Sequence, residues 1–294
     1  MKKKIVIYGI GIFFSKVLVF CMIPIYTRFL ETTDYGYYDV LISNMQMLVS
    51  ISFIEIWSGI IRFMFESDTS PYKTIKTCIE LLPILMIFYA IGVILLSFIM
   101  EIRYPILTVI YGISYMMFNC FNNICRGLGK NVDYIVSGVI RTIVSCGMNI
   151  YGIVVLHKGV SFLILSEIVG FLFAVLYVEI KTHSILNGMK EITDKQKKEE
   201  MLLYCFPLMI NSFSFLFLGT YNKNIVLREL GEMASGYYAF VLKYSAILSI
   251  IISVYSLAWQ EVAFQKASQE TRAESYSFYI NKLKLPTPKQ GFAP

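Results

Sequence analysis

The sequence of 294 residues is 56% hydrophobic and only 16% charged, with a mean hydropathy of +0.63. Soluble domains are about half apolar and about a quarter charged, so this composition excludes an ordinary soluble domain and indicates a surface that meets lipid. The net charge of +6 would also be compatible with a nucleic-acid partner. The positions of the basic residues, described below, decide against one.

Eight apolar stretches approach the length that a helix needs to cross a membrane, about 20 residues. They cover residues 5–26, 40–63, 78–100, 105–125, 134–156, 160–180, 201–221 and 236–258. Because unpaired backbone groups are too costly in hydrocarbon, each stretch is predicted to be helical. The predicted fold class is therefore all-α, a polytopic bundle of about eight transmembrane helices.

The first stretch follows Met1 and three lysines, a start that is also typical of secretory signal peptides. It contains Lys16 and passes Pro24 without a small-residue cleavage site. We therefore predict that it is a permanent membrane helix.

Lys and Arg concentrate in the cytoplasmic loops of bacterial membrane proteins. If the N-terminus is inside and the helices alternate, most loop cations fall on the inside: Lys2, Lys3, Lys4, Arg62, Lys73, Lys76, Arg126, Lys130, Lys181, Lys190, Lys195, Lys197 and Lys198. The sequence thus predicts a multi-pass protein of the bacterial plasma (inner) membrane with a cytoplasmic N-terminus. Because topology accounts for the positive charge, no nucleic-acid partner is expected.

The chain is predicted to contain two helical units. Residues 1–181 form a complete six-helix unit, and the charged segment 182–200 is a cytoplasmic linker. Residues 201–272 form the first two helices of a second unit, followed by a non-spanning tail at 273–294.

A weak internal repeat supports this division. The triplet Gly-Tyr-Tyr occurs at 36–38 and again at 236–238, an offset of 200 residues, and the two tryptophans, Trp57 and Trp259, are offset by 202. Chance recurrence is the alternative. Because both triplets follow the first helix of a unit, we favour a duplication that produced parallel units related by an axis along the membrane normal.

Six charged side chains are predicted to lie inside or at the edge of the membrane, where charges are expensive and by default functional. They are Lys16, Glu55, Arg62, Arg141, Glu167 and Lys243. We predict that they line a substrate-binding cavity, with Lys16 near the midplane. Two alternatives remain. Arg62 could lie at the membrane interface, and Glu55 and Arg141 could form an ion pair with a purely structural role.

Signals of catalysis are missing from the sequence. It contains no HExxH, GxSxG or Walker motif, and its six cysteines form no CxxC pair. Neither catalytic residues nor a metal or cofactor are therefore predicted, and the protein is not expected to be an enzyme. Transport without a nucleotide site would be facilitated or ion-driven.

Several segments resemble one family as an ordered set. They are Ser15-Lys16, Pro-Ile-Tyr-Thr-Arg-Phe-Leu at 24–30, Asp-Tyr-Gly-Tyr-Tyr-Asp at 34–39, Ile-Arg-Phe at 61–63, Ala-Trp-Gln at 258–260 and Phe264. This set resembles the polysaccharide biosynthesis (oligosaccharide flippase) proteins, part of the multidrug/oligosaccharidyl-lipid/polysaccharide exporter superfamily. The resemblance implies further helices after residue 272, so the sequence reads as a C-terminally shortened member.

The resemblance also implies a fold and a function. It implies two six-helix bundles around a central cavity that works by alternating access. The substrate would be an undecaprenyl-diphosphate-linked oligosaccharide for O-antigen or capsule assembly, and the partners would be membrane lipids and other polysaccharide-assembly proteins. The alternatives are a cation-coupled multidrug exporter of the same superfamily and a membrane enzyme of polysaccharide assembly.

Overall fold

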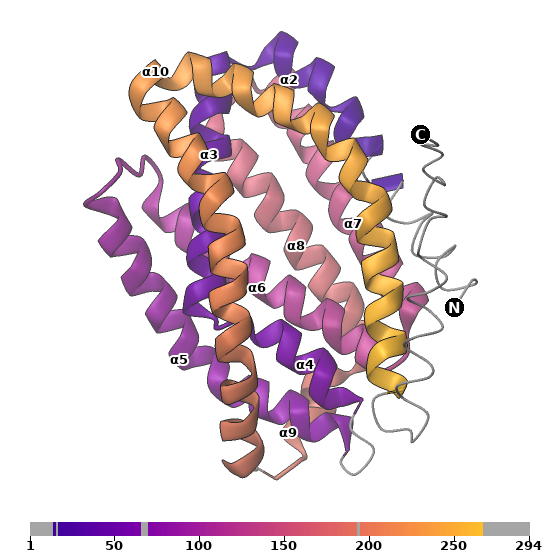
Figure 1. Cartoon of the computed structure of the whole chain (residues 1–294). Helices are drawn as coiled ribbons and strands as arrows, with labels where there is room; N and C mark the ends of the chain where they lie inside the picture. Colours follow the sequence, from indigo (N-terminus) through magenta and orange to yellow (C-terminus); the bar gives the residue numbers. More distant parts are fainter. Residues whose placement is uncertain (1–13, 16, 66–69, 193–194, 267–294) are drawn as a thin grey trace, which may run out of the picture.

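Helices make up most of the chain that the computed structural model describes, which comprises residues 14–15, 17–65, 70–192 and 195–266 (Figure 1). For 244–255 and 257–266 only the backbone is described. Four helical segments are long and apolar enough to cross a membrane: α5 (Pro71–Ser97), Asn131–Val155, α8 (Val160–Thr182) and Lys195–Lys243. The bent pair α3 and α4 makes a fifth. The predicted fold class, an all-α membrane bundle, is confirmed.

The number of spans recognised by apolar length within the described residues is lower than the eight predicted. The predicted first helix lies partly outside those residues, and its described part is the short apolar helix Val17–Phe29, which ends in α2 (Ile23–Phe29). The fourth helix is present as α6 (Pro105–Gly127), close to the bounds predicted at 105–125. Its asparagines lower its hydropathy, and it can carry them because it packs among α4, α5, α7 and α8 rather than facing lipid alone.

The second predicted helix is broken. α3 (Thr32–Ser52) and α4 (Ile56–Met64) replace the single helix predicted at 40–63 and meet at 53°. Ile54 and Glu55 at the break both have φ of 52°, a left-handed conformation that bulky and β-branched residues rarely adopt. α3 also begins earlier than predicted, so the Gly-Tyr-Tyr triplet lies in its first turns and not in a loop.

The remaining helices of the first unit follow the prediction closely. α5 begins before the predicted residue 78, with Ser70 as its N-cap. α7 (Asn131–Ile150) continues into a π-helical turn at Tyr151–Val155, and together they match the helix predicted at 134–156. α8 matches the helix predicted at 160–180.

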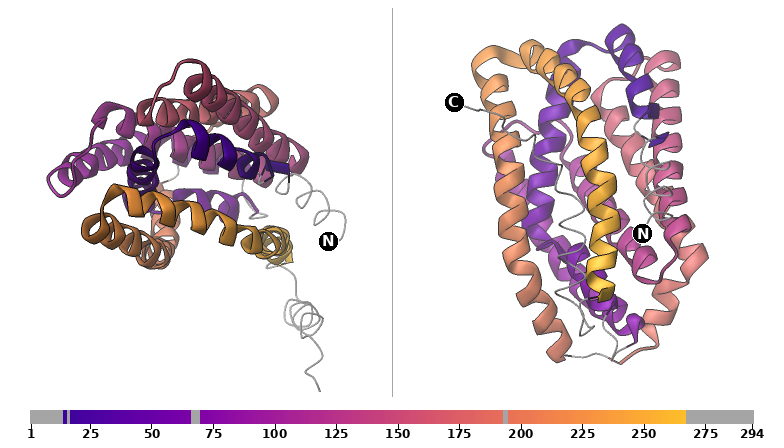
Figure 2. Two further views of the ribbon diagram at one scale, coloured as in Figure 1. Left: turned by 90° about the horizontal axis from the view of Figure 1, so that it is seen from above. Right: turned by 45° about the vertical axis from the view of Figure 1, so that its right-hand side comes forward.

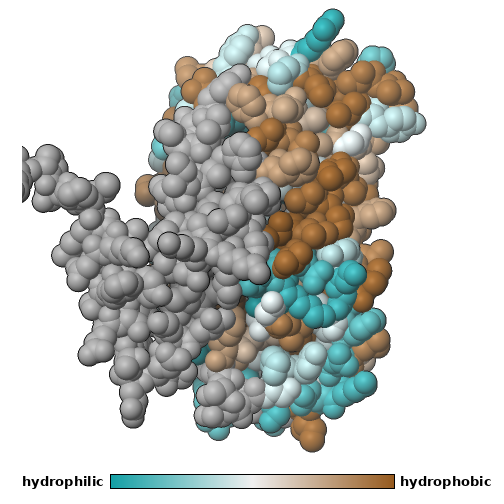
Figure 3. Space-filling model, turned by 90° about the vertical axis from the view of Figure 1, so that its right-hand side faces the viewer, coloured by the Kyte–Doolittle hydropathy of each residue, from teal (hydrophilic) through white to brown (hydrophobic). Residues whose placement is uncertain are grey.

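The outer surface of the bundle is apolar. On α5, Ile87 and Phe88 are 61% and 60% exposed, whereas Leu85 and Tyr89 on the opposite face are buried. Figure 3 shows a continuous apolar area above a polar area on the described part of one face of the molecule. Exposed apolar residues of this density are what a helix needs to face lipid.

α10 (Lys195–Lys266) consists of two helices that meet at a kink, and they contain the helices predicted at 201–221 and 236–258. The kink is at Gly231, with φ 83° and ψ 175°, a conformation that costs glycine little. It lies within 222–235, where a loop was predicted, but the other residues of that segment extend the two helices. Figure 1 shows the first part of α10 running beside α3 and the second part descending from the same end of the bundle.

The segment predicted as a linker contains a short helix. α9 (Ser184–Met189) packs against α5, where Gly188 lies close to Ile75. Viewed along the bundle, α10 lies on one side of the other helices (Figure 2). The linker therefore runs from the end of α8 past the end of α5 to the side of the bundle where α10 lies.

The two copies of the Gly-Tyr-Tyr triplet meet at the end of the bundle where α3 begins. A Cβ atom on Gly36 would overlap the carbonyl oxygen of Glu232, and one on Gly236 would overlap the carbonyl oxygen of Thr32. The contact is reciprocal under the 200-residue offset, because 36 faces 232 and 236 faces 32. A local two-fold axis produces reciprocal contacts of this kind, which supports the predicted duplication.

The orientation in the membrane gives a first testable prediction. In a background without the six native cysteines, the Arg228→Cys variant should react with a membrane-impermeant maleimide in intact cells, because that side chain is 87% exposed near the outer end. The Lys190→Cys variant, with an exposed position beside α9, should react only after permeabilisation. Equal labelling of both variants in intact cells would contradict the cytoplasmic N-terminus.

Candidate functional site

Polar side chains join α3 to the first part of α10. Lys223 Nζ lies 2.6 Å from Asp39 Oδ2 and donates a hydrogen bond of 2.8 Å to Ser43 Oγ. The amides of Asn44 and Asn224 exchange two hydrogen bonds of 3.1 and 3.2 Å. Because such bonds hold helices together within a membrane, this face fixes α10 against the first unit.

Arg103, in the loop between α5 and α6, links the units at the end where the two glycines meet. Its guanidinium lies 3.5 Å from Asp34 Oδ1 on α3 and 2.5 Å from Glu232 Oε1 on α10. It also lies 4.3 Å from the ring centroid of Tyr37. Backbone contact and charge pairing therefore close the bundle at this end.

Arg141 on α7 and Glu167 on α8 form an ion pair inside the first unit. The Arg141 guanidinium lies 4.7 Å from the ring centroid of Phe171, which places it over the aromatic face. Its Nε is buried and has no hydrogen-bond partner among the described residues. The guanidinium is thus buried with one donor unsatisfied.

Lys243 brings a positive charge from the second unit to the same region. Its Nζ lies 5.4 Å from the ring centroid of Tyr35, and it is within electrostatic range of Asp39, Glu167 and Arg141. The Tyr35 hydroxyl is buried without a hydrogen-bond partner among the described residues. Cations from both units therefore face one polar region.

Tyrosines continue this polar region toward the break between α3 and α4. Tyr111 on α6 packs edge-on against Phe171, the ring over which the Arg141 guanidinium lies. One turn later, Tyr115 also packs against Phe171 and lines the pocket that contains Glu55. A row of aromatic rings thus runs from the Arg141–Glu167 pair to Glu55.

Glu55 occupies the break itself. It is 7% exposed and accepts hydrogen bonds of 3.2 Å from the hydroxyls of Ser50 and Ser58. Ser212 and Trp57 line the same pocket beside it. No basic side chain of the described residues pairs with this carboxylate.

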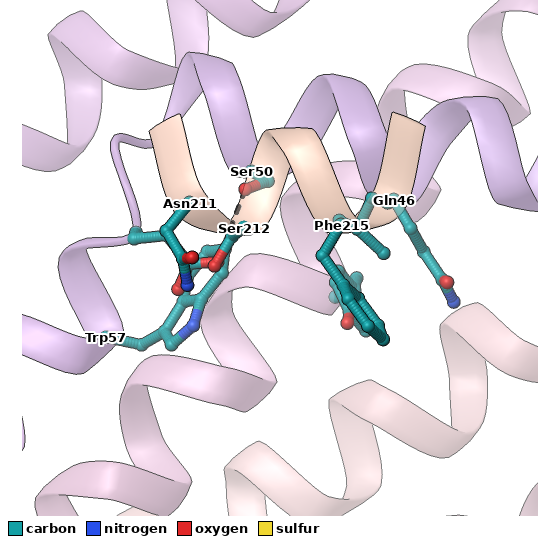
Figure 4. A pocket seen from close by; sticks show the side chains of 9 residues that line it. Gln46, Ser50, Trp57, Asn211, Ser212 and Phe215 are labelled. Carbon is teal, nitrogen blue, oxygen red and sulfur yellow. Dashed lines mark hydrogen bonds between the residues drawn. The ribbon is translucent and has the colours of Figure 1, made fainter. Parts of the chain in front are cut away.

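A pocket of about 310 Å³ opens beside Glu55, between α3, α4, α6 and α10 (Figure 4). Figure 4 shows Trp57, Asn211 and Ser212 close to Ser50, with Phe215 and Gln46 further along. The walls are therefore built from aromatic rings, amides and hydroxyls around one carboxylate.

The structure brings together most, but not all, of the residues predicted for the cavity. Arg141, Glu167 and Lys243 share one region, and Glu55 joins it through Tyr115. Arg62 lies apart, at the end of α4 beside Phe63. Lys16 lies outside the described residues.

The pairing suggested for Glu55 and Arg141 is wrong, because Arg141 pairs with Glu167. Counting residues along the helices had placed Arg141 in the inner half of the membrane and Glu167 in the outer half. The two side chains nevertheless meet, because α7 and α8 pack side by side and the arginine side chain is long.

Several residues of the region were not predicted. Asp39, Lys223 and Asn224 were placed in or near loops, so their role in joining helices was missed. The sequence offers one signal for them. Asp39 and Lys223 have opposite charges, Asn44 and Asn224 both carry amides, and all four were predicted at or near the outer edge of the membrane. Asn211 and Ser212 carry no signal, because isolated amides and hydroxyls are common in membrane helices.

Comparison with known proteins gives the family. The model of the family described as polysaccharide biosynthesis protein matches residues 1–260. No curated protein and no solved structure matches the chain. The matched range covers all five candidate spans and the two Gly-Tyr-Tyr triplets, so the resemblance carried by the N-terminal segments is confirmed. The chain belongs to the polysaccharide biosynthesis protein family of membrane proteins.

Proposed function

We propose that the protein is a flippase that moves an undecaprenyl-diphosphate-linked oligosaccharide from the cytoplasmic to the outer leaflet of the bacterial plasma membrane. The observation that carries this proposal is the convergence of Arg141 from the first unit and Lys243 from the second on one polar region. Membrane lipids and other polysaccharide-assembly proteins are its proposed partners, and O-antigen or capsule its proposed product pathway.

The charges suit a diphosphate. Isolated anions are too costly in hydrocarbon, so a diphosphate needs fixed cations at depth. Arg141 offers a planar guanidinium fork, whereas Lys243 offers a point charge. Glu167 holds Arg141 in place while no substrate is bound, and the diphosphate then competes with that carboxylate for the guanidinium.

Alternating access is the proposed mechanism. The units are joined at the outer end by Gly36, Gly236 and Arg103. This arrangement suits a state that is closed to the outside, in which substrate enters from the cytoplasmic side. We propose transport without a catalytic step and without a cofactor.

A cation-coupled multidrug exporter is the second candidate. The observation in its favour is Glu55, a buried carboxylate without a basic partner among the described residues. Cationic drugs would compete for this carboxylate, whereas a diphosphate would not. A drug-stimulated transport that depends on Glu55 and ignores Lys243 would favour this candidate.

Charge reversal at Lys243 tests the proposal. In liposomes that contain the protein and a fluorescent undecaprenyl-diphosphate saccharide, Lys243→Glu should slow flipping at least tenfold, about 1.4 kcal/mol in the barrier. Lys243→Arg should stay within about threefold of the native rate, because the sign of the charge is kept.

Lys190→Glu is the matched control, since it reverses the same charge at an exposed position outside the spans. It should flip at the native rate. Native rates in Lys243→Glu would contradict the role of this lysine in diphosphate binding.

A further inference from the structure

The break between α3 and α4 stores backbone strain beside the Glu55 pocket. Ile54 and Glu55 are consecutive, and both have a left-handed φ of 52° although neither is a glycine. Such conformations are strained and persist where the surrounding structure requires them, often at ligand sites. The break turns the Glu55 carboxylate and the Trp57 indole toward the same pocket.

The carboxylate of Glu55 is surrounded by neutral donors. Ser50 and Ser58 donate hydrogen bonds of 3.2 Å to it, and Ser212 and Trp57 lie beside it in the wall of the pocket. No basic side chain of the described residues forms an ion pair with it. It can accept further hydrogen bonds from a ligand that carries hydroxyl or amide N–H groups.

The pocket is much larger than a bare ion requires. Its volume of about 310 Å³ is roughly ten times the liquid volume of a water molecule, about 30 Å³. It lies at the lower end of the range for small-ligand pockets, about 300–1,000 Å³. A single ring-sized molecule fits this volume.

The walls specify the chemistry of that ring. Trp57, Tyr115 and Phe215 offer aromatic surface, and Gln46 and Asn211 offer amides that both donate and accept (Figure 4). A sugar ring has apolar C–H faces, which pack on aromatic rings, and a rim of hydroxyls, which pair with amides and donate to a carboxylate.

We propose that this pocket binds one uncharged sugar ring, with Glu55 accepting its hydroxyl hydrogen bonds and Trp57 packing on its face. The proposal rests on the proposed function and deepens it. Tyr115 lines the pocket and packs against Phe171, the ring over which the Arg141 guanidinium lies, so these two rings connect a sugar in the pocket to a diphosphate held by Arg141. The pocket would hold the sugar attached to that diphosphate.

The charge of Glu55 makes it a specificity-determining residue. A sugar that carries a carboxylate would bring a second negative charge to a buried acid, and like charges at close range repel strongly in a low dielectric. The pocket therefore selects neutral sugars over uronic acids. Glu55→Gln keeps the shape and removes this repulsion.

The chain provides its own reporter for an experiment. It has two tryptophans, so Trp259→Phe leaves Trp57 as the single fluorophore. In a detergent without a sugar headgroup, methyl glucoside and methyl N-acetylglucosaminide are titrated against the purified protein, with methyl glucuronide as the acidic probe. At least one neutral glycoside should change the fluorescence saturably, and the glucuronide should bind at least tenfold more weakly.

Two variants test the assignment of Glu55 and its neighbours. Glu55→Gln should weaken neutral binding about tenfold and abolish discrimination against the glucuronide. Asn211→Ala should also weaken neutral binding, and because Asn211 is exposed on α10 this variant tests the pocket without disturbing a buried site. Thermal unfolding of each variant establishes that it is folded.

Arg141→Gln separates this proposal from the proposed function. Combined with Glu167→Gln, so that no unpaired charge remains, it should bind neutral glycosides as the parent does while flipping of the lipid-linked substrate is lost. Saturable sugar binding in a protein that flips no lipid would overturn the proposed function and leave the pocket assignment standing. No saturable response to either neutral glycoside, or native discrimination in Glu55→Gln, would overturn the sugar assignment.

Discussion

Replacing Gly236 with valine should unfold or separate the two units, with a loss of about 3 kcal/mol or more. The new side chain would occupy the position of the Thr32 carbonyl oxygen. Overpacking a well-packed site costs about 1–3 kcal/mol, and here the obstacle is backbone that cannot rotate away. The midpoint of thermal unfolding in detergent should fall, and the amount of protein in the membrane should fall with it.

Gly219→Val is the matched control, because it lies on the same helix and a Cβ there meets nothing within 4 Å. It should unfold within a few degrees of the native protein. Gly36→Val should reproduce the effect of Gly236→Val, since the contact is reciprocal. A stable, active Gly236→Val protein would show that the units do not meet through these glycines.

The second large effect is expected from separating Arg141 and Glu167. Arg141→Ala leaves Glu167 charged in an environment where its side chain is only 16% exposed. Removing one partner of a buried ion pair costs about 3–5 kcal/mol. Thermal unfolding of Arg141→Ala should therefore show a loss near the lower end of this range.

The double variant Arg141→Gln with Glu167→Gln distinguishes structure from function. Two neutral amides leave no unpaired charge, so most of the stability should return. Flipping should remain lost, because the cation for the diphosphate is gone. A double-mutant cycle gives the coupling energy directly, and recovery of both stability and flipping would reduce the pair to a structural role.

Helix positions were predictable where the sequence marks their ends. Pro105 begins α6, and Gly159 precedes α8, both as typical helix boundaries. The hydrophobic stretches between such markers predicted the core of the first unit. Composition and length alone therefore gave the fold class.

The break at Glu55 could not be predicted, because no proline or glycine lies between Ser50 and Ser58. Neither residue of the break, Ile54 or Glu55, is of a type that favours the left-handed conformation it adopts. The helical structure of most of 222–235 was also missed. The polar stretch at 222–235 looks like a loop, but Lys223 and Asn224 are satisfied by side chains of α3.

Candidate site residues were predictable as individual positions but not as a constellation. A charged residue inside an apolar stretch is easily recognised in the sequence as a candidate functional residue, as Arg141 and Lys243 were. The direction in which a side chain leaves its helix depends on packing, so the partner of Arg141 was not predictable from depth. The pocket beside Glu55 depends on α10 and therefore on contacts between units.

The reciprocal glycine contact also bears on the ancestry of the protein. Before a duplication, the surface around Gly36 would have faced its own copy in a second molecule, as the interface of a symmetric homodimer. The small residues Thr32 and Gly36, four apart on one helix, are a common dimerisation pattern in membranes. A unit with an even number of helices returns the chain to its starting side, so two genes joined head to tail encode halves that insert in the same orientation. Fusion of the genes would then have preserved an interface that already existed, and freed each half to diverge.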